Sequence, residues 1–84
     1  MNQEQITQQL TQALNQIIPS YGQDFWTPDT ELVGAIAEFD SMAIVTLIGE
    51  MEELFDIEFD DEDITGEHFA SVASLTQLVQ ARLG

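Results

Sequence analysis

Few residues of this sequence could take part directly in a reaction. Histidine occurs once, at His68, and cysteine is absent, which excludes thiolate catalysis and thiolate metal sites. A Ser-His-acid triad needs a histidine that is held by a carboxylate and faces the nucleophile. Nothing in the spacing of Ser41 and His68 indicates such a meeting, and we expect His68 to lie on the surface beside Glu67. With no glycine-rich phosphate loop either, we expect a protein that is not an enzyme.

The acidic segment before His68 resembles a metal site only in part. Its carboxylates fit positions 1, 3, 5 and 12 of a calcium-loop template: Asp56, Glu58, Asp60 and Glu67. The template fails at its sixth position, where Asp61 replaces the glycine that permits the turn, and at its eighth, where Asp63 replaces an apolar residue. We therefore expect no metal site, and keep an acidic helical interaction or calcium-binding module as the alternative of another class.

Ser41 is the one hydroxyl in a distinctive setting. Asp40 and Ser41 directly precede a run with helical spacing, and both residue types are good N-caps, so Ser41 could be a plain cap. A helix N-terminus also favours phosphate, through its free N–H groups and the helix dipole. A phosphodiester on Ser41 would suit that place, and a serine beside a loop is open to another enzyme.

The sequence pattern predicts the helices that position Ser41 and His68. Apolar residues recur at helical spacing over about 3–18 and 41–55, and again after Ser71, which has the character of a cap. Pro19 ends the first run because proline cannot continue the hydrogen-bonded turn. A further short helical turn is expected at residues 67–69. The pattern predicts an all-α fold.

Residues 19–39 form a long connection in this prediction. Proline, glycine and serine punctuate the segment, with a short turn of helix expected near residues 32–36. It also carries apolar residues that we expect to lie on the helices: Tyr21, Phe25, Trp26, Leu32, Val33, Ile36 and Phe39.

The length and net charge of the chain limit the number of domains and the kinds of partner that we expect. The chain has 84 residues, of which 44% are hydrophobic, so a single domain over 1–84 is expected. It has a net charge of −15, which disfavours nucleic acid and anionic membranes and favours basic protein partners. The amino-terminal residues lack the features of a secretory signal, and no stretch is long enough to span a membrane. We expect a cytoplasmic monomer.

Asp40-Ser41-Met42 resembles the Asp-Ser-Leu signature of acyl carrier proteins. The resemblance continues through residues 44–59, the acidic residues 60–63 and the apolar residues from Phe69 to Leu75. It covers nearly the whole chain and is strongest from Leu32 onward.

The resemblance implies a four-helix bundle with a long loop between helices 1 and 2 and a short third helix. It implies that a phosphopantetheinyl transferase moves 4'-phosphopantetheine from coenzyme A to the Ser41 hydroxyl, with Asp40 helping recognition. The arm would hold acyl groups as thioesters for acyl-loading and acyl-transferring enzymes, which have basic surfaces. Partner contacts are expected at Met42, Glu50 and Glu53, and an acyl chain could be sheltered near three apolar residues of the second helix: Val45, Leu47 and Ile48.

Three positions depart from the family pattern. Met42 replaces leucine, and Ala43 and Thr46 stand where fatty-acid carriers often have acidic residues. The departures suggest a specialised carrier instead of one for housekeeping fatty-acid synthesis. An aminoacyl carrier of the D-alanyl type and a polyketide or peptide-synthetase carrier remain alternatives.

Overall fold

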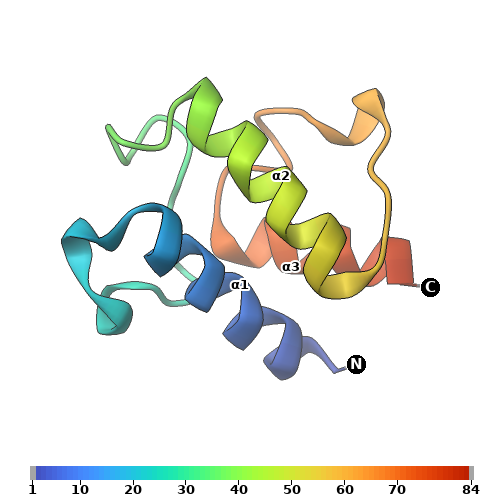
Figure 1. Ribbon diagram of the computed structural model, residues 1–84, viewed down its shortest axis with the longest axis horizontal. Coiled ribbons are helices and arrows are strands. Elements are labelled where there is room, and N and C mark those ends of the chain that lie inside the picture. The colour runs from blue at the N-terminus through green and yellow to red at the C-terminus, as the bar shows by residue number, and fades with distance from the viewer. Residues whose placement is uncertain (1, 84) are drawn as a thin grey trace.

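Three α-helices make up most of the chain in the computed structural model, which describes residues 2–83. They are α1 (Gln3–Ile17), α2 (Ser41–Phe55) and α3 (Val72–Leu83). Figure 1 shows α1 and α2 running side by side, and α3 packs against α1, with the two termini at the same side of the molecule. The predicted all-α class is confirmed, and the predicted ranges of the first two helices agree with the observed ones to within a residue.

Each helix begins where a side chain binds its first free N–H groups. Asn2 and Gln5 form a reciprocal capping box at the start of α1. Asp40 caps α2, because its Oδ1 accepts from the Ala43 N–H at 3.0 Å. At the start of α3, the Ser71 hydroxyl accepts from the Ser74 N–H at 3.1 Å, as its residue type predicted.

The expected count of four helices is not confirmed. Between α2 and α3, the described residues form only a 3₁₀ turn at Asp61–Asp63 and a hydrogen-bonded turn in which the Phe69 N–H donates to the Thr65 carbonyl at 3.1 Å. The Asp60 N–H donates to Asp63 Oδ2 at 3.0 Å, the Asp63 N–H donates to the Asp60 carbonyl at 2.9 Å, and the 3₁₀ turn between them has only three residues. The short helical turn predicted at 67–69 therefore exists as a single turn.

The core joins all three helices and both connections. Its fully buried side chains, each below 2% exposure, are Ile6, Leu10, Leu14, Leu32, Leu47, Met51, Phe69, Val72, Leu75, Thr76 and Val79. The one polar member, Thr76, is hydrogen-bonded to the Thr7 hydroxyl across the α1–α3 contact at 3.0 Å and to the Val72 carbonyl. Burial of this apolar surface is the main stabilising contribution in a chain without disulfides.

The long connection between α1 and α2 is attached to the start of α3. The Leu32 N–H donates to the Ala70 carbonyl at 2.7 Å, and the Val72 N–H donates to the Thr30 carbonyl at 3.0 Å. These bonds fix the segment that leads to Asp40.

The predicted packing of the connection is only partly correct. Four of its apolar residues are buried in the core, namely Trp26, Leu32, Ile36 and Phe39. Tyr21, Phe25 and Val33 are 40–42% exposed, so they are not part of the buried core. Two further 3₁₀ turns, Pro19–Tyr21 and Gln23–Phe25, instead pack the first two aromatic rings against each other.

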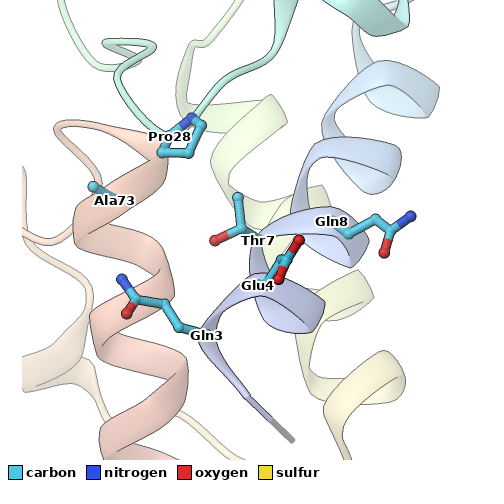
Figure 2. Close-up of a pocket in the computed structure, with 6 residues that line it drawn as sticks. All are labelled: Gln3, Glu4, Thr7, Gln8, Pro28 and Ala73. Carbon is cyan, nitrogen blue, oxygen red and sulfur yellow. The ribbon is translucent and has the colours of Figure 1, made fainter.

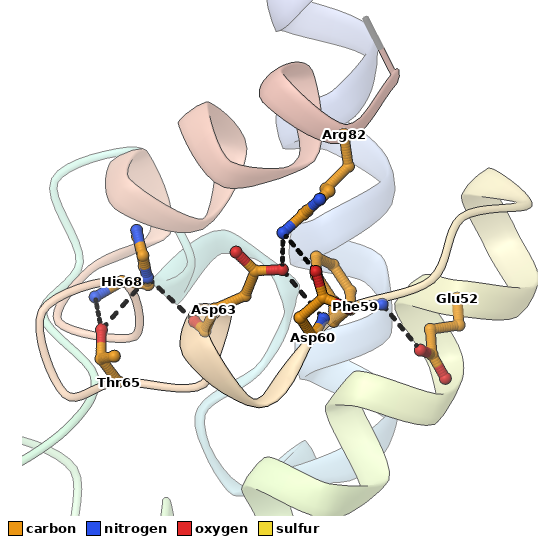
Figure 3. Close-up of polar contacts among 7 residues, drawn as sticks. All are labelled: Glu52, Phe59, Asp60, Asp63, Thr65, His68 and Arg82. Atoms are coloured by element: carbon orange, nitrogen blue, oxygen red, sulfur yellow. Dashed lines mark hydrogen bonds and ion pairs between the residues drawn. The ribbon is translucent and has the colours of Figure 1, made fainter.

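The connection between α2 and α3 is held by polar side chains (Figure 3). Arg82 on α3 forms ion pairs with Asp63 and, at 3.3 Å, with Asp60. Glu52 on α2 accepts from the Phe59 N–H at 3.0 Å. The connection is therefore tied to both helices that it joins. Within residues 2–83, no helix has both the length and the apolar character that a membrane span requires.

Candidate functional site

Ser41 lies at the exposed N-terminus of α2. It is the first residue of the helix, and the cap is Asp40, so the two residues have separate places. The Asp40 side chain accepts from the Ala43 N–H, and the Asp40 carbonyl accepts from the Ile44 N–H. Within residues 2–83, the N–H groups of Ser41 and Met42 have no hydrogen-bond acceptor. Free amides at the positive end of a helix dipole suit a phosphodiester, so these residues fit a phosphopantetheine arm.

The face of α2 that continues from Ser41 toward solvent is unusually apolar. Met42 is 75% exposed and Val45 is 67% exposed. Thr46 is also exposed, and its hydroxyl donates to the Met42 carbonyl at 2.9 Å, so it is open to a partner only as an acceptor. Ala43 faces the core at 8% exposure. Of the two positions that lack the expected acidic residue, only Thr46 therefore alters the surface.

The two glutamates expected to meet partners differ in their surroundings. Glu53 is exposed and lines an open groove with Gly49, Glu52 and Asp56. Glu50 is half-buried and lies with Leu54 in a different groove, against α1. Only Glu53 shares the outward face of Met42.

The three residues suggested for sheltering an acyl chain differ in their burial. Leu47 is fully buried in the core and Ile48 is half-buried against it. Val45 is on the outer face, so its assignment to an interior cavity is wrong.

His68 belongs to the polar network of the second connection and makes no contact with Ser41. Its Nδ1 lies 2.9 Å from the Asp63 carbonyl and 3.1 Å from the Thr65 hydroxyl (Figure 3). Because a carbonyl only accepts, Nδ1 carries the proton in the first of these bonds. The ring is half-buried, so the expected surface position is only partly correct. Among residues 2–83 no three His, Asp or Glu side chains are grouped so that they could hold a metal ion.

The sequence interpretation missed a polar and aromatic contact just before the site. Tyr21 donates to Glu38 Oε1 at 2.8 Å, three residues ahead of Ser41. This hydrogen bond raises the pKa of the Tyr21 hydroxyl above its usual value. Tyr21, Phe25 and Trp26 lie within residues 21–26 of the long connection, and this local cluster of aromatic residues is the signal that the sequence contains.

An open groove lies away from Ser41, at the amino-terminal end of α1 (Figure 2). It is lined by Gln3, Glu4, Thr7 and Gln8 of α1, together with Pro28 and Ala73. Its lining includes no residue of the site described above.

Comparison with known proteins identifies the family to which the chain belongs. Residues 8–79 match the family model described as "Phosphopantetheine attachment site". The fold matches the solution structure of a holo acyl carrier protein from Nitrosomonas europaea, with a TM-score of 0.83 and 31% identity over 94% of this chain and 96% of that one. No curated protein matches the sequence. The chain belongs to the acyl carrier protein family: it is a carrier with a covalently attached 4'-phosphopantetheine group, and not an enzyme.

Proposed function

We propose that Ser41 is the attachment residue and that the chain presents acyl thioesters to partner enzymes. The observation that supports this most directly is the exposed position of Ser41 as the first residue of α2, beside a cap supplied by a different side chain. Loading requires a hydroxyl that a transferase can reach. An exposed Ser41 meets that requirement, and Asp40 would hold the helix start while the transferase works.

The partners in this proposal are a phosphopantetheinyl transferase and acyl-loading or acyl-transferring enzymes with basic surfaces. Asp40 would be recognised by the transferase, and Met42 and Glu53 by later partners, while Glu50 would contact a partner from the groove against α1. The cargo is a fatty acid-like or specialised acyl group, and aminoacyl, polyketide and peptide cargoes remain alternatives. The expected monomer and cytoplasmic location stay predictions.

The exposed apolar pair Met42 and Val45 favours a specialised carrier. A strongly acidic carrier attracts basic partner enzymes through charge. Here, however, the surface next to Ser41 consists of two apolar side chains and a threonine. An apolar contact surrounded by carboxylates would select partners by shape as well as by charge.

Co-expression with a broad-range phosphopantetheinyl transferase tests the proposal. Intact mass should rise by one phosphopantetheine group in the wild type, and the gain should vanish in Ser41→Ala. Ser20→Ala is the matched control, because Ser20 is also exposed but lies in the 3₁₀ turn after α1. A gain that survives in Ser41→Ala would place the arm on another residue.

A further inference from the structure

Three aromatic rings form an exposed surface on the connection that leads to Ser41. Tyr21 and Phe25 are stacked, with ring centroids 4.4 Å apart and planes 19° from parallel. Both rings meet Trp26 edge-on, at centroid distances of 6.1 and 5.1 Å. Trp26 is 5% exposed, whereas Tyr21 and Phe25 are 40% and 42% exposed. The stacked pair therefore rests on a buried indole and leaves part of its surface to solvent.

The surrounding backbone fixes this arrangement. Gly22 has φ 81° and ψ 160° between the two 3₁₀ turns, a conformation that is almost restricted to glycine. The bond between Tyr21 and Glu38 joins the pair to the segment before α2. Glu38 and Ser41 are three residues apart, so their Cα atoms are at most about 11 Å apart. The aromatic pair is thus close enough for one partner to touch both it and Ser41.

Charge indicates what this surface would bind. Glu38 is an exposed carboxylate that binds the Tyr21 hydroxyl, and Asp24 is an exposed residue directly before Phe25 in the same 3₁₀ turn. The chain has one Arg or Lys residue in total, Arg82, and it is paired with Asp60 and Asp63. Among residues 2–83, no Arg or Lys side chain is therefore available for this surface. Exposed aromatic faces flanked by carboxylates attract a guanidinium group, which stacks on the rings while the carboxylates bind its N–H groups.

We propose that Tyr21 and Phe25, with Asp24 and Glu38, form a docking site for an arginine side chain of a basic partner protein. A second copy of this chain is disfavoured as the occupant, because both copies would carry a charge of −15. That the partner is an enzyme working on the carrier rests on the proposed function. The peptide titration below tests the arginine site without any partner enzyme. The mass gain at Ser41 is a separate measurement, so failure of one proposal can be distinguished from failure of the other.

The probe is a capped pentapeptide with one central arginine among glycines, titrated into the full-length ¹⁵N-labelled protein at low ionic strength. Peptides with lysine or neutral citrulline at the centre are the controls. Amide shifts should concentrate at residues 21–26 and 38, and the arginine δ-methylene protons should move upfield over the rings. Trp26, the only tryptophan, gives a second readout through its emission.

Two variants test the rings and the charge. Phe25→Leu keeps apolar bulk but removes the ring, and should weaken arginine binding about two- to fivefold. Ile64→Leu is its control, since Ile64 is 41% exposed but follows the 3₁₀ turn at 61–63. Glu38→Gln should also weaken binding, whereas Glu67→Gln, at an exposed carboxylate on the other connection, should not.

Three results would overturn the proposal. The first is equal binding of the arginine and citrulline peptides by the wild type, which needs no variant to fold. The second is a set of shifts spread over the whole acidic surface. The third is a Trp26 emission that changes on acylation of the arm but not with peptide, which would assign the surface to cargo.

Discussion

The start of α2 and the connection between α2 and α3 both depend on an aspartate that accepts a backbone N–H, but the two aspartates have different surroundings. Asp40 is exposed, and its assigned side-chain bond is local, to the Ala43 N–H. Asp63 is 8% exposed, binds the Asp60 N–H at 3.0 Å and pairs with Arg82 from α3.

This difference gives the two regions different roles: the start of α2 leaves Ser41 accessible, whereas the connection between α2 and α3 is held against the core. At the start of α2 the local cap shapes the helix without covering Ser41, so the hydroxyl is open to another protein. In the second connection, bonds across long stretches of sequence hold a segment with little regular structure against the core. Substitutions in the first region should therefore change loading and recognition, and those in the second should change stability.

The largest effect on stability should come from Phe69→Ala. Phe69 is the large side chain that the second connection places in the core, at 1% exposure. Its truncation should lower the free energy of unfolding by about 3–5 kcal/mol, measured by urea denaturation. Met42→Ala, at a 75% exposed position, should change it by no more than about 0.5 kcal/mol. Equal losses in the two variants would contradict the division between the regions.

Asp40→Ala should cost about 1 kcal/mol of stability through the lost cap, and should also slow loading of Ser41. Asp40→Asn separates the two effects, because asparagine caps as well as aspartate but carries no charge. If the transferase reads the charge, Asp40→Asn should retain the thermal midpoint while its loading rate, followed by intact mass, falls. Wild-type loading by Asp40→Asn would mean that Asp40 serves only as a cap.

A smaller effect should appear in the pH dependence of stability. The Asp60 N–H and then Arg82 hold the pKa of the Asp63 carboxyl below its usual value of about 3.9, against an opposing effect of burial. A lowered folded-state pKa means that this stabilisation is complete above the unfolded-state value and is lost as the pH falls through the folded one. The stability difference between wild type and Arg82→Gln should therefore be largest at neutral pH and shrink in acid. Chemical denaturation at fixed ionic strength measures it, and a constant difference across the acid range would remove the Asp63–Arg82 pair as its source.

The smallest effect concerns charge reversal on α2. Glu53→Lys should weaken binding to the transferase a few-fold at low salt, and less at high salt, because the attraction is screened. Glu50→Lys should matter less, since Glu50 is half-buried in the groove against α1. Affinities from calorimetry at two salt concentrations compare the variants, and an equal loss in both would show that exposure on the outward face does not decide recognition.

Local patterns predicted the helices well because their causes are local. Pro19 ends α1, Asp40 and Ser41 mark the start of α2, and Ser71 caps α3, as each residue type indicated. The prediction of Ser41 as the attachment residue rests on the predicted helix start together with the resemblance around Asp40-Ser41-Met42, and the structure confirms the helix start.

Long-range contacts explain what the sequence did not reveal. The partners of Arg82 are 19 and 22 residues away, and no periodicity links them. Likewise, apolar type alone could not distinguish Trp26, which enters the core, from Phe25, which stacks on Tyr21 at the surface. Of the short third helix that the resemblance implied, the described residues have only the 3₁₀ turn at Asp61–Asp63 and the hydrogen-bonded turn that ends at Phe69.

The pairing of Arg82 also affects how whole molecules meet. With its only Arg or Lys residue engaged by two aspartates, the chain has a net charge of −15 and little positive charge to offset it, so two copies repel each other. The protein should therefore remain dispersed at high concentration in dilute buffer. Added salt, which screens the repulsion, is the condition under which it should first self-associate.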